Sequence, residues 1–242
     1  MELRIFQKGF NFSQDGPGNR LVYHLQGCNL RCPWCSNPEG IPLEGGDCRS
    51  VDELVEEVMR SRAMFFEGGG VTLTGGEIGV QIDGVKEFLK QLHLRGIHTA
   101  VETNGTSPRL SELFEFLDYL IMDCKHHDPA FHKQVVGVSN AETFKNIQKA
   151  VENGVQLALR IPVSGGFNAT EQDAQAFAAL FERLQIKQAA TIELLPYHEY
   201  GKDKYKKMGW EYHMTQQAKV SRELITQMEN CLREHGFKII ST

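Results

Sequence analysis

Three cysteines in a C-x3-C-x2-C spacing constrain this chain more than any other feature. Cys28, Cys32 and Cys35 directly follow an apolar run at residues 21–25, which is typical of a buried strand. We therefore expect them on a loop just past the carboxyl end of that strand, where its turns can point three thiolates at one centre. A structural zinc site is closed by four protein ligands, whereas three ligands leave one position open. Because thiolates bind zinc, copper and iron–sulfur clusters, the spacing alone does not choose between zinc and iron–sulfur.

The other cysteines and the composition exclude several classes of protein. Cys48, Cys124 and Cys231 stand alone, and six irregularly spaced cysteines in 242 residues do not form the framework of a small secreted protein. No stretch approaches the roughly 18 apolar residues of a membrane span, and the first residues lack the apolar core of a secretion signal. A net charge of −5 without a basic run gives no reason to expect nucleic acid. We expect a cytoplasmic protein without membrane or nucleic-acid contacts.

Strand-like and helix-like segments alternate along the chain. The expected strands cover residues 21–26, 71–74, 99–102, 119–123, 157–163 and 191–195, with a last short strand at 237–240. The expected helices begin at a capping box over residues 50–53 and then cover 83–95, 110–117, 141–153, 170–184 and about 215–234. Such alternation implies parallel strands with right-handed crossovers. With no linker, low-complexity run or composition break, residues 1–242 are expected to form one α/β domain, either barrel-like or an open doubly wound sheet.

Polar residues gather just past the ends of these strands. In chain order they are Gly75, Gly76 and Glu77, then Glu102, Thr103 and Asn104, then Asp123 and Lys125, and finally Arg160 in the fifth strand and His198 after the sixth. In parallel α/β folds ligands bind at the carboxyl ends of the strands, so we expect these residues around one pocket. Paired glycines allow close backbone approach, and carboxylates beside a lysine and an arginine suit a zwitterionic amino-acid ligand.

Together these motifs resemble the radical S-adenosylmethionine (radical SAM) superfamily. The motifs that carry the resemblance are the cysteine spacing with Trp34 before the last cysteine, Asp15-Gly16-Pro17-Gly18-Asn19-Arg20, Gly75-Gly76-Glu77, Asp123-x-Lys125 and Leu195-Pro196-Tyr197-His198. Among radical SAM enzymes they look like the glycyl radical enzyme activating enzymes, and most like those of pyruvate formate-lyase. The resemblance covers about residues 15–209. It implies a partial (β/α)6, TIM-like barrel.

The resemblance also implies the cofactors. Cys28, Cys32 and Cys35 would hold three irons of one [4Fe–4S] cluster, and S-adenosylmethionine would chelate the fourth iron. Its amino group would meet Gly75-Gly76-Glu77, its carboxylate Lys125 and Arg160 beside Asp123, and its adenosyl part Asn37 and His198. Glu102, Thr103 and Asp123 match positions that bind a monovalent cation in the pyruvate formate-lyase activators. Glu102 replaces the family's Asp there, and whether the extra methylene keeps, shifts or abolishes the cation site stays open.

The implied reaction is reductive cleavage of S-adenosylmethionine to a 5′-deoxyadenosyl radical, which abstracts a glycine α-hydrogen from a partner glycyl radical enzyme. Asp15 and Arg20 would bind the partner's loop near the mouth of the barrel, although Asp15-Gly16-Pro17-Gly18 is equally consistent with a simple tight turn. A flavodoxin or ferredoxin would supply the electron, and we expect a monomer. Only Cys48 lies between Cys35 and the helix near residue 51, so we expect no ferredoxin-like insert and one cluster only.

The sequence is also consistent with three alternatives. The first is a radical SAM enzyme acting on a small molecule, against which the segment at residues 15–20 and the tail argue. The second is an activator of anaerobic ribonucleotide reductase, a family that is usually much shorter. The third is a non-catalytic zinc-binding protein. A lysine-rich stretch at residues 202–207 fits either a docking lip or, as the default, a solvated loop.

Overall fold

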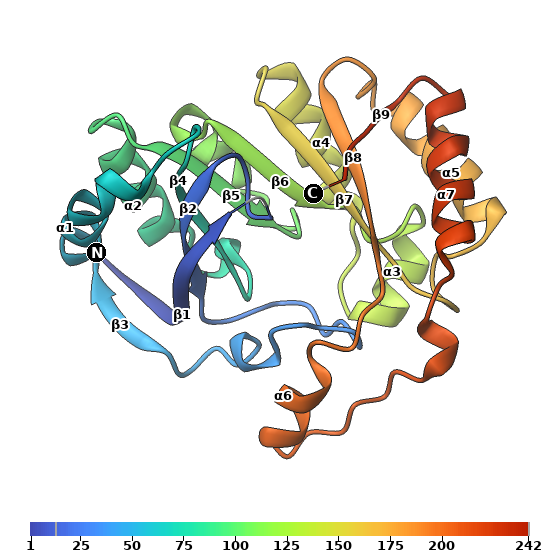
Figure 1. Cartoon of the computed structure of the whole chain (residues 1–242), viewed down its shortest axis with the longest axis horizontal. Helices are drawn as coiled ribbons and strands as arrows, with labels where there is room; N and C mark the ends of the chain where they lie inside the picture. Colours follow the sequence, from blue (N-terminus) through green and yellow to red (C-terminus); the bar gives the residue numbers. More distant parts are fainter. Residues whose placement is uncertain (13, 242) are drawn as a thin grey trace.

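The core of the molecule is a curved sheet with helices on its outer side (Figure 1). The computed structural model describes residues 1–12 and 14–241. The strands are β1 (Glu2–Phe12), β2 (Asn19–Leu25), β3 (Asp47–Ser50), β4 (Gly70–Gly75), β5 (His98–Thr103), β6 (Tyr119–Asp123), β7 (Leu157–Val163), β8 (Ala190–Pro196) and β9 (Lys238–Ile239). Their spatial order is β3-β1-β2-β4-β5-β6-β7-β8-β9. The strands from β2 to β9 are parallel to one another, whereas β1 is antiparallel to both β2 and β3.

Helices follow most of the parallel strands and cover the convex side of the sheet. The helices on that side are α1 (Val51–Ser61), α2 (Ile82–His93), α4 (Ala141–Glu152), α5 (Glu171–Arg183) and α7 (Arg222–Glu234). Helices α3 (Pro129–Val136) and α6 (Lys202–Lys207) instead contact the cysteine loop. Short 3-10 turns occupy Pro38–Gly40, Arg62–Met64, Ile78–Gln81, Leu110–Phe116 and Gln216–Ala218. Helix α1 begins with the expected capping box, because the Ser50 side chain accepts from the Glu53 N–H while the Glu53 carboxylate accepts from the Ser50 N–H. None of these helices is long and apolar enough to cross a membrane.

Successive residues of each parallel strand point to opposite faces of the sheet, and the two faces differ in chemistry. On the convex face, residues such as Tyr23, Val101 and Leu159 join the hydrophobic core between the sheet and the helices. On the concave face, the buried positions include Thr72 and Arg160. The concave side is therefore the side on which polar chemistry can take place.

The partial α/β barrel expected from the sequence is confirmed, with three corrections. The amino-terminal residues add an antiparallel pair, β1 and β3, which the alternating pattern did not predict. Helices α3 and α6 were also not predicted. The helix expected at about 215–234 was wrong in its first third: Ser221 caps α7, and the residues before it turn away so that the Ala218 carbonyl accepts from the Gly165 N–H at 2.9 Å.

Candidate active site

A cavity of about 230 Å³ opens at the carboxyl ends of the central strands. It brings together twelve of the residues expected from the sequence: Cys28, Cys32, Cys35, Asn37, Gly75, Gly76, Glu77, Glu102, Thr103, Asp123, Lys125 and His198. These residues are spread over 171 positions of sequence, from 28 to 198. Their convergence follows from the parallel register, which places the carboxyl ends of all these strands on the same rim.

The cysteine loop forms one wall of this cavity. It is held by backbone hydrogen bonds: the Gly27 N–H donates to the Gly40 carbonyl at 2.9 Å and the Cys35 N–H to the Cys32 carbonyl at 3.1 Å. Burial raises the pKa of Cys28 and Cys32 to about 12 and that of Cys35 to about 11. The metal-free thiols are therefore protonated at neutral pH, and metal binding must displace their protons.

The spacing of the three cysteine sulfurs bears on whether they hold a single zinc ion. Four thiolates around one Zn²⁺ lie about 3.8 Å apart, given Zn–S bonds of about 2.3 Å in a tetrahedron. Among the residues that the structure describes, the one trio of His, Cys, Asp or Glu whose ligand atoms all lie within 4.8 Å of one another is His126, His127 and Asp173. Cys28, Cys32 and Cys35 are therefore not gathered around one point as the ligands of a single zinc ion are.

The two glycines after β4 allow the next loop to pack against the cysteine loop. Gly75 has a φ of +120°, and a Cβ at Gly76 would lie 2.2 Å from the Gly27 carbonyl oxygen. Because no side chain fits there, the Gly76 N–H can donate to the Leu25 carbonyl at 2.8 Å and the Glu77 N–H to the Gly27 carbonyl at 2.7 Å. The glycine pair therefore places Glu77 directly beside the cysteines.

Glu77 is a buried carboxylate held by three donors. Its Oε1 accepts from the Thr103 hydroxyl at 2.6 Å and from the Gly79 N–H at 2.9 Å, while its Oε2 accepts from the Asn104 N–H at 2.8 Å. Burial raises the pKa of Glu77, although these hydrogen bonds oppose the shift. A ligand ammonium group in the cavity would compensate the buried negative charge.

Across the cavity, Lys125 supplies a positive charge. Its Nζ donates to Asp123 Oδ2 at 2.6 Å, and its side chain is almost fully buried. Burial by itself lowers the pKa of Lys125, but Asp123 and the nearby cysteine sulfurs raise it above its usual value. Lys125 therefore stays charged and can attract the carboxylate of an amino-acid ligand.

Asn37 and His198 lie on the rim near α6. The Asn37 Oδ1 accepts from Lys204 Nζ at 2.7 Å, which ties the cysteine loop to the segment after β8. The His198 ring stacks on Tyr200 with 3.9 Å between ring centroids, and burial lowers the pKa of His198. This rim offers a flat neutral ring of the kind that packs against a purine.

Arg160 is not among the residues that line this cavity; it lies below the rim in β7. Its Nη1 donates to Glu102 Oε1 at 2.6 Å and its Nε to Glu193 Oε2 at 2.9 Å, while its Nη2 donates to the Gln14 carbonyl. All three guanidinium nitrogens thus have acceptors within the protein. Glu193, which accepts from Arg160, was not predicted from the sequence, because a single carboxylate inside an apolar strand belongs to no recognisable motif.

Arg20 lies near the amino-terminal end of β2 and is not among the residues that line the cavity. The side chain is fully buried at the start of β2, with its Nε donating to Thr72 Oγ1 at 2.6 Å and its Nη2 to the Val71 carbonyl at 2.6 Å. Burial lowers the pKa of Arg20 to about 10. Asp15 is partly exposed, and its carbonyl accepts from the Thr72 hydroxyl at 2.6 Å. Arg20 and Thr72 therefore anchor the loop that carries Asp15.

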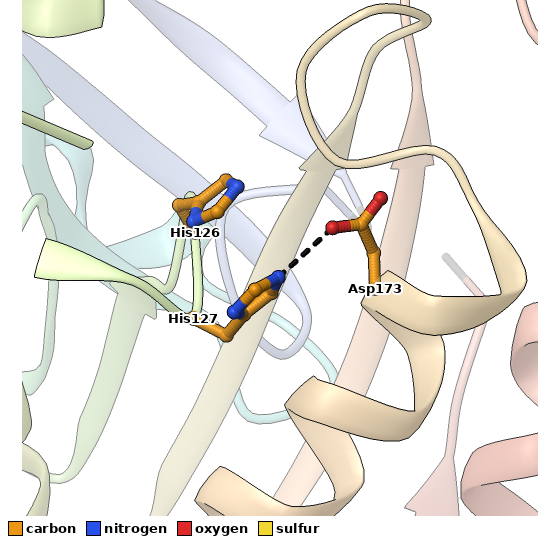
Figure 2. A group of neighbouring side chains, drawn as sticks. All are labelled: His126, His127 and Asp173. Carbon is orange, nitrogen blue, oxygen red and sulfur yellow. Dashed lines mark hydrogen bonds and ion pairs between the residues drawn. The ribbon is translucent and has the colours of Figure 1, made fainter. Parts of the chain in front are cut away.

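A layer of rings and polar groups lies behind the cavity and was not predicted. Trp34 packs on Phe167 at 4.6 Å, and the His126 ring lies 5.0 Å from the same phenylalanine. Figure 2 shows His126 and His127 beside Asp173 of α5, with His127 Nε2 2.9 Å from Asp173 Oδ1. Both ring nitrogens of His126 are engaged, one by the Phe167 carbonyl and one by the Asp128 N–H. The group thus fixes the Lys125 loop to α5 through hydrogen bonds.

Comparison with known proteins identifies the family of this chain. Residues 22–178 match the model of the Radical SAM superfamily. The chain is a member of this superfamily. It is 33% identical over 231 residues to the pyruvate formate-lyase 1-activating enzyme of Escherichia coli K12, with 93% of each chain covered. It is also 33% identical over 223 residues to the pyruvate formate-lyase-activating enzyme of Clostridium pasteurianum, covering 91% of this chain and 92% of that one. The chain thus belongs with the glycyl radical enzyme activating enzymes.

Other comparisons agree on the fold and leave the partner open. The choline trimethylamine-lyase activating enzyme of Oleidesulfovibrio alaskensis is 29% identical, with 93% of both chains covered. A domain of a pyruvate-formate lyase-activating enzyme from Bacteroides vulgatus superposes with a TM-score of 0.57 at 28% identity, covering 71% of this chain and 98% of that one. A radical SAM methyltransferase from Sphaerobacter thermophilus gives a TM-score of 0.69 at 16% identity, covering 96% and 67%, and shares the fold.

Proposed function

We propose that this radical SAM enzyme activates a glycyl radical enzyme. A [4Fe–4S] cluster held in the cavity would deliver one electron to S-adenosylmethionine and release methionine and a 5′-deoxyadenosyl radical, which then takes a glycine α-hydrogen from the partner protein. The observation that carries the proposal is the single cavity that combines three cysteines with a buried carboxylate and a buried lysine.

The residues of the cavity suit the two ends of this cofactor. Three cysteines leave one iron of a cluster without a protein ligand, so the amino-acid part of the cofactor can reach it. Glu77 faces that space from beside the cysteine loop and suits the ammonium group, while Lys125 suits the carboxylate. Asn37 and His198 on the rim then lie where the adenosyl part would extend. The carboxylates that line the cavity also suit a sulfonium ligand with a net positive charge.

Apolar side chains complete the wall of the cavity. Leu30, Trp34, Pro162, Leu195 and Tyr197 line it together with the polar residues. A primary carbon radical abstracts hydrogen from most C–H bonds, so the site must exclude competing donors and hold its target close. We propose that this apolar part of the wall, with the partner's loop in place, performs that exclusion.

For the partner, we propose that Asp15 contacts the backbone of the glycine-bearing loop. Asp15 is partly exposed, and the loop around it is fixed through Thr72 and Arg20. Arg20 would thus act as a positioning residue, since its own donors are used within the protein. The relatives named above act on pyruvate formate-lyase and choline trimethylamine-lyase, and we propose a partner of this lyase class.

For the electron donor, we propose an acidic one-electron carrier of the flavodoxin or ferredoxin class, docking on α6. Lys206 and Lys207 are exposed there, and the helix packs against the cysteine loop. The Tyr205 hydroxyl donates to the Cys32 carbonyl at 3.4 Å, and the Gly201 backbone lies so close to the Cys35 carbonyl that a Cβ there would be 2.1 Å from it. A donor bound on these lysines would therefore approach the cluster loop directly.

The segment between the cysteine loop and α1 is short. Between Cys35 and α1 lie only a 3-10 turn, the short strand β3 and the exposed Cys48. We propose one domain with one cluster, acting as a monomer in the cytoplasm. We do not include the monovalent cation implied by the resemblance, because its expected ligands Glu102, Thr103 and Asp123 have other partners within the protein.

Anaerobic reconstitution tests the proposal. The protein should take up about four irons per chain, and dithionite with S-adenosylmethionine should then yield 5′-deoxyadenosine. Electron paramagnetic resonance should show a glycyl radical on pyruvate formate-lyase or a related lyase after incubation with the reduced protein. Stoichiometric zinc without iron would overturn the proposal, and 5′-deoxyadenosine without a radical on any lyase tested would favour a small-molecule substrate.

A further inference from the structure

The cavity contains three side chains that the family resemblance assigns to a monovalent cation, and their contacts in this chain are of a different kind. Both oxygens of Glu102 are engaged: Oε1 accepts from Arg160 Nη1 at 2.6 Å, and Oε2 accepts from the Thr74 hydroxyl at 3.0 Å. The carboxylate thus already has a cation and a hydrogen-bond donor. A metal ion would have to displace the guanidinium or share it.

The other two expected ligands also have hydrogen-bond partners within the protein. The Thr103 hydroxyl donates to Glu77 Oε1 at 2.6 Å and accepts from the Gly105 N–H at 3.0 Å. Asp123 Oδ2 accepts from Lys125 Nζ at 2.6 Å. Alkali cations need several oxygens converging on one point. In this chain a cation would have to displace the Arg160 guanidinium from Glu102 and the Lys125 ammonium from Asp123, so the three side chains do not fit the implied cation.

Side-chain length at position 102 explains the difference. Through the parallel register Glu102 lies level with Ile121, and Ile121 with Ala158, so Arg160 stands two residues further along β7. Two strand residues correspond to roughly 7 Å along the strands, and because β6 lies between β5 and β7 the two side chains also span about 9.6 Å across the sheet, roughly 12 Å in all. Glutamate extends about 1.5 Å further than aspartate, by one C–C bond. The extra methylene is what brings the carboxylate to the guanidinium.

Arg160 is well suited to act as a fixed cation. Its side chain is 9% exposed, and its second carboxylate partner is Glu193 on the neighbouring strand. Burial alone lowers the pKa of Arg160, but the charges of Glu102 and Glu193 raise it above its usual value. An arginine keeps its charge under all physiological conditions and binds carboxylates with fixed geometry. It therefore supplies permanently the charge that a bound ion supplies only at sufficient concentration.

We propose that the guanidinium of Arg160, reached by the longer Glu102, replaces the monovalent cation in this protein. Arg160 is then a positioning residue: it fixes Glu102 and the wall of the cofactor cavity without touching the cofactor. The inference rests on the proposed function, since it concerns how S-adenosylmethionine is bound. It distinguishes this chain from relatives with aspartate at the corresponding position, and it predicts cofactor binding that is independent of sodium and potassium.

Cofactor binding in different salts tests the inference. The reconstituted protein is titrated with S-adenosylmethionine by calorimetry in potassium, sodium and choline chloride of equal ionic strength. We expect dissociation constants that agree within about twofold. A tenfold weaker affinity in choline that millimolar potassium restores would overturn the inference. Failure to bind S-adenosylmethionine in every salt would instead overturn the proposed function, so the two failures are distinguishable.

Two variants sharpen the test. Glu102→Asp withdraws the carboxylate from Arg160 and restores the family's residue, so its affinity should become several-fold stronger in potassium than in choline. Glu193→Gln leaves the Glu102–Arg160 pair intact and should remain insensitive to the cation. If Glu102→Asp binds the cofactor equally well in all three salts, the side-chain length argument is wrong. The melting temperature of each variant in each salt verifies that the compared proteins are folded.

Discussion

The two faces of the central sheet are built by the same strands but differ in the side chains that they bury. On the convex face every strand except β3 contributes apolar side chains to one core; Tyr23, for example, meets Phe88 of α2 edge to face, with 5.8 Å between the rings. On the concave face the same strands carry charged groups, among them Arg20 and Arg160, which are buried and hydrogen-bonded. A residue's place on one face or the other changes with each step along the strand.

The difference shows how stability and chemistry are separated in this protein. The convex face gains free energy from removing apolar area from water, a non-directional effect that tolerates repacking. The concave face depends on directional contacts, since a buried charge without partners is strongly unfavourable. Mutations on the convex face should therefore change stability, and mutations at the concave rim should change activity. The following predictions test that separation.

The largest effect is expected at the rim. Replacement of Cys32 by alanine removes one of three cluster ligands and should abolish reductive cleavage of S-adenosylmethionine, measured as 5′-deoxyadenosine, while the melting temperature of the metal-free protein stays nearly unchanged. Cys48→Ala is the matched control, because Cys48 is exposed and lies outside the cavity. An unchanged 5′-deoxyadenosine yield for Cys32→Ala would refute its role, and loss of iron in Cys48→Ala would refute the single-cluster count.

On the convex face, Phe88→Ala should destabilise the protein by about 3–5 kcal/mol, since it leaves a cavity against Tyr23. Denaturant unfolding measures this change. The folded fraction should still bind S-adenosylmethionine, because the cavity lies at the strand ends. Phe10→Ala provides the comparison: Phe10 is 45% exposed, so a change within about 0.5 kcal/mol is expected. Comparable losses in both variants would contradict the location of the core.

On the concave face, Arg20→Met should cost roughly 3 kcal/mol, because the Val71 and Pro17 carbonyls and the Thr72 hydroxyl lose a charged donor. The apolar methionine keeps much of the volume, so packing is little changed. The exposed Arg109, paired with Asp83 and Glu112, serves as control, and Arg109→Met should cost less than about 1 kcal/mol. Equal effects in urea unfolding would mean that burial of Arg20 matters less than its contacts suggest.

The smallest predicted effect is a dependence on pH at α3, beside the cysteine loop. Burial lowers the pKa of His132 to about 4, and its Nδ1–H donates to the Val138 carbonyl at 2.6 Å. The unfolded chain binds a proton at His132 more tightly than the folded protein does. The free energy of unfolding is therefore at its full value above about pH 6.5 and decreases as the pH falls toward 4. The loss amounts to about 2 kcal/mol by pH 5.

His132→Gln isolates that contribution, since the amide can still donate to the Val138 carbonyl but does not titrate. For each protein, the decrease in the free energy of unfolding between pH 7 and pH 5 is measured. This decrease should be about 2 kcal/mol smaller in the variant than in the wild type. Parallel pH profiles for the two proteins would show that His132 is not responsible.

The sequence predicted the convex face and the rim better than the interior. Apolar runs marked β6 and β7 with the bounds that the structure gives them, because burial behind helices requires such runs. The polar residues at the strand ends were found because parallel strands all end on one rim. Arg160 was expected at the cofactor, but the structure pairs it with Glu102 and Glu193. Glu193 itself and the antiparallel β1 were not foreseen, since neither has a local pattern.

The sequence by itself determined the cysteine spacing, the glycine pair and the order of polar strand ends, because these depend on neighbouring residues along the chain. The tertiary structure alone decided which charges meet. Cys28, Cys32 and Cys35 lie within one loop, whereas Arg160 finds its partners through the registers of β5, β7 and β8. A shift of two residues in any of these registers would move a carboxylate by roughly 7 Å, which is more than a hydrogen bond spans.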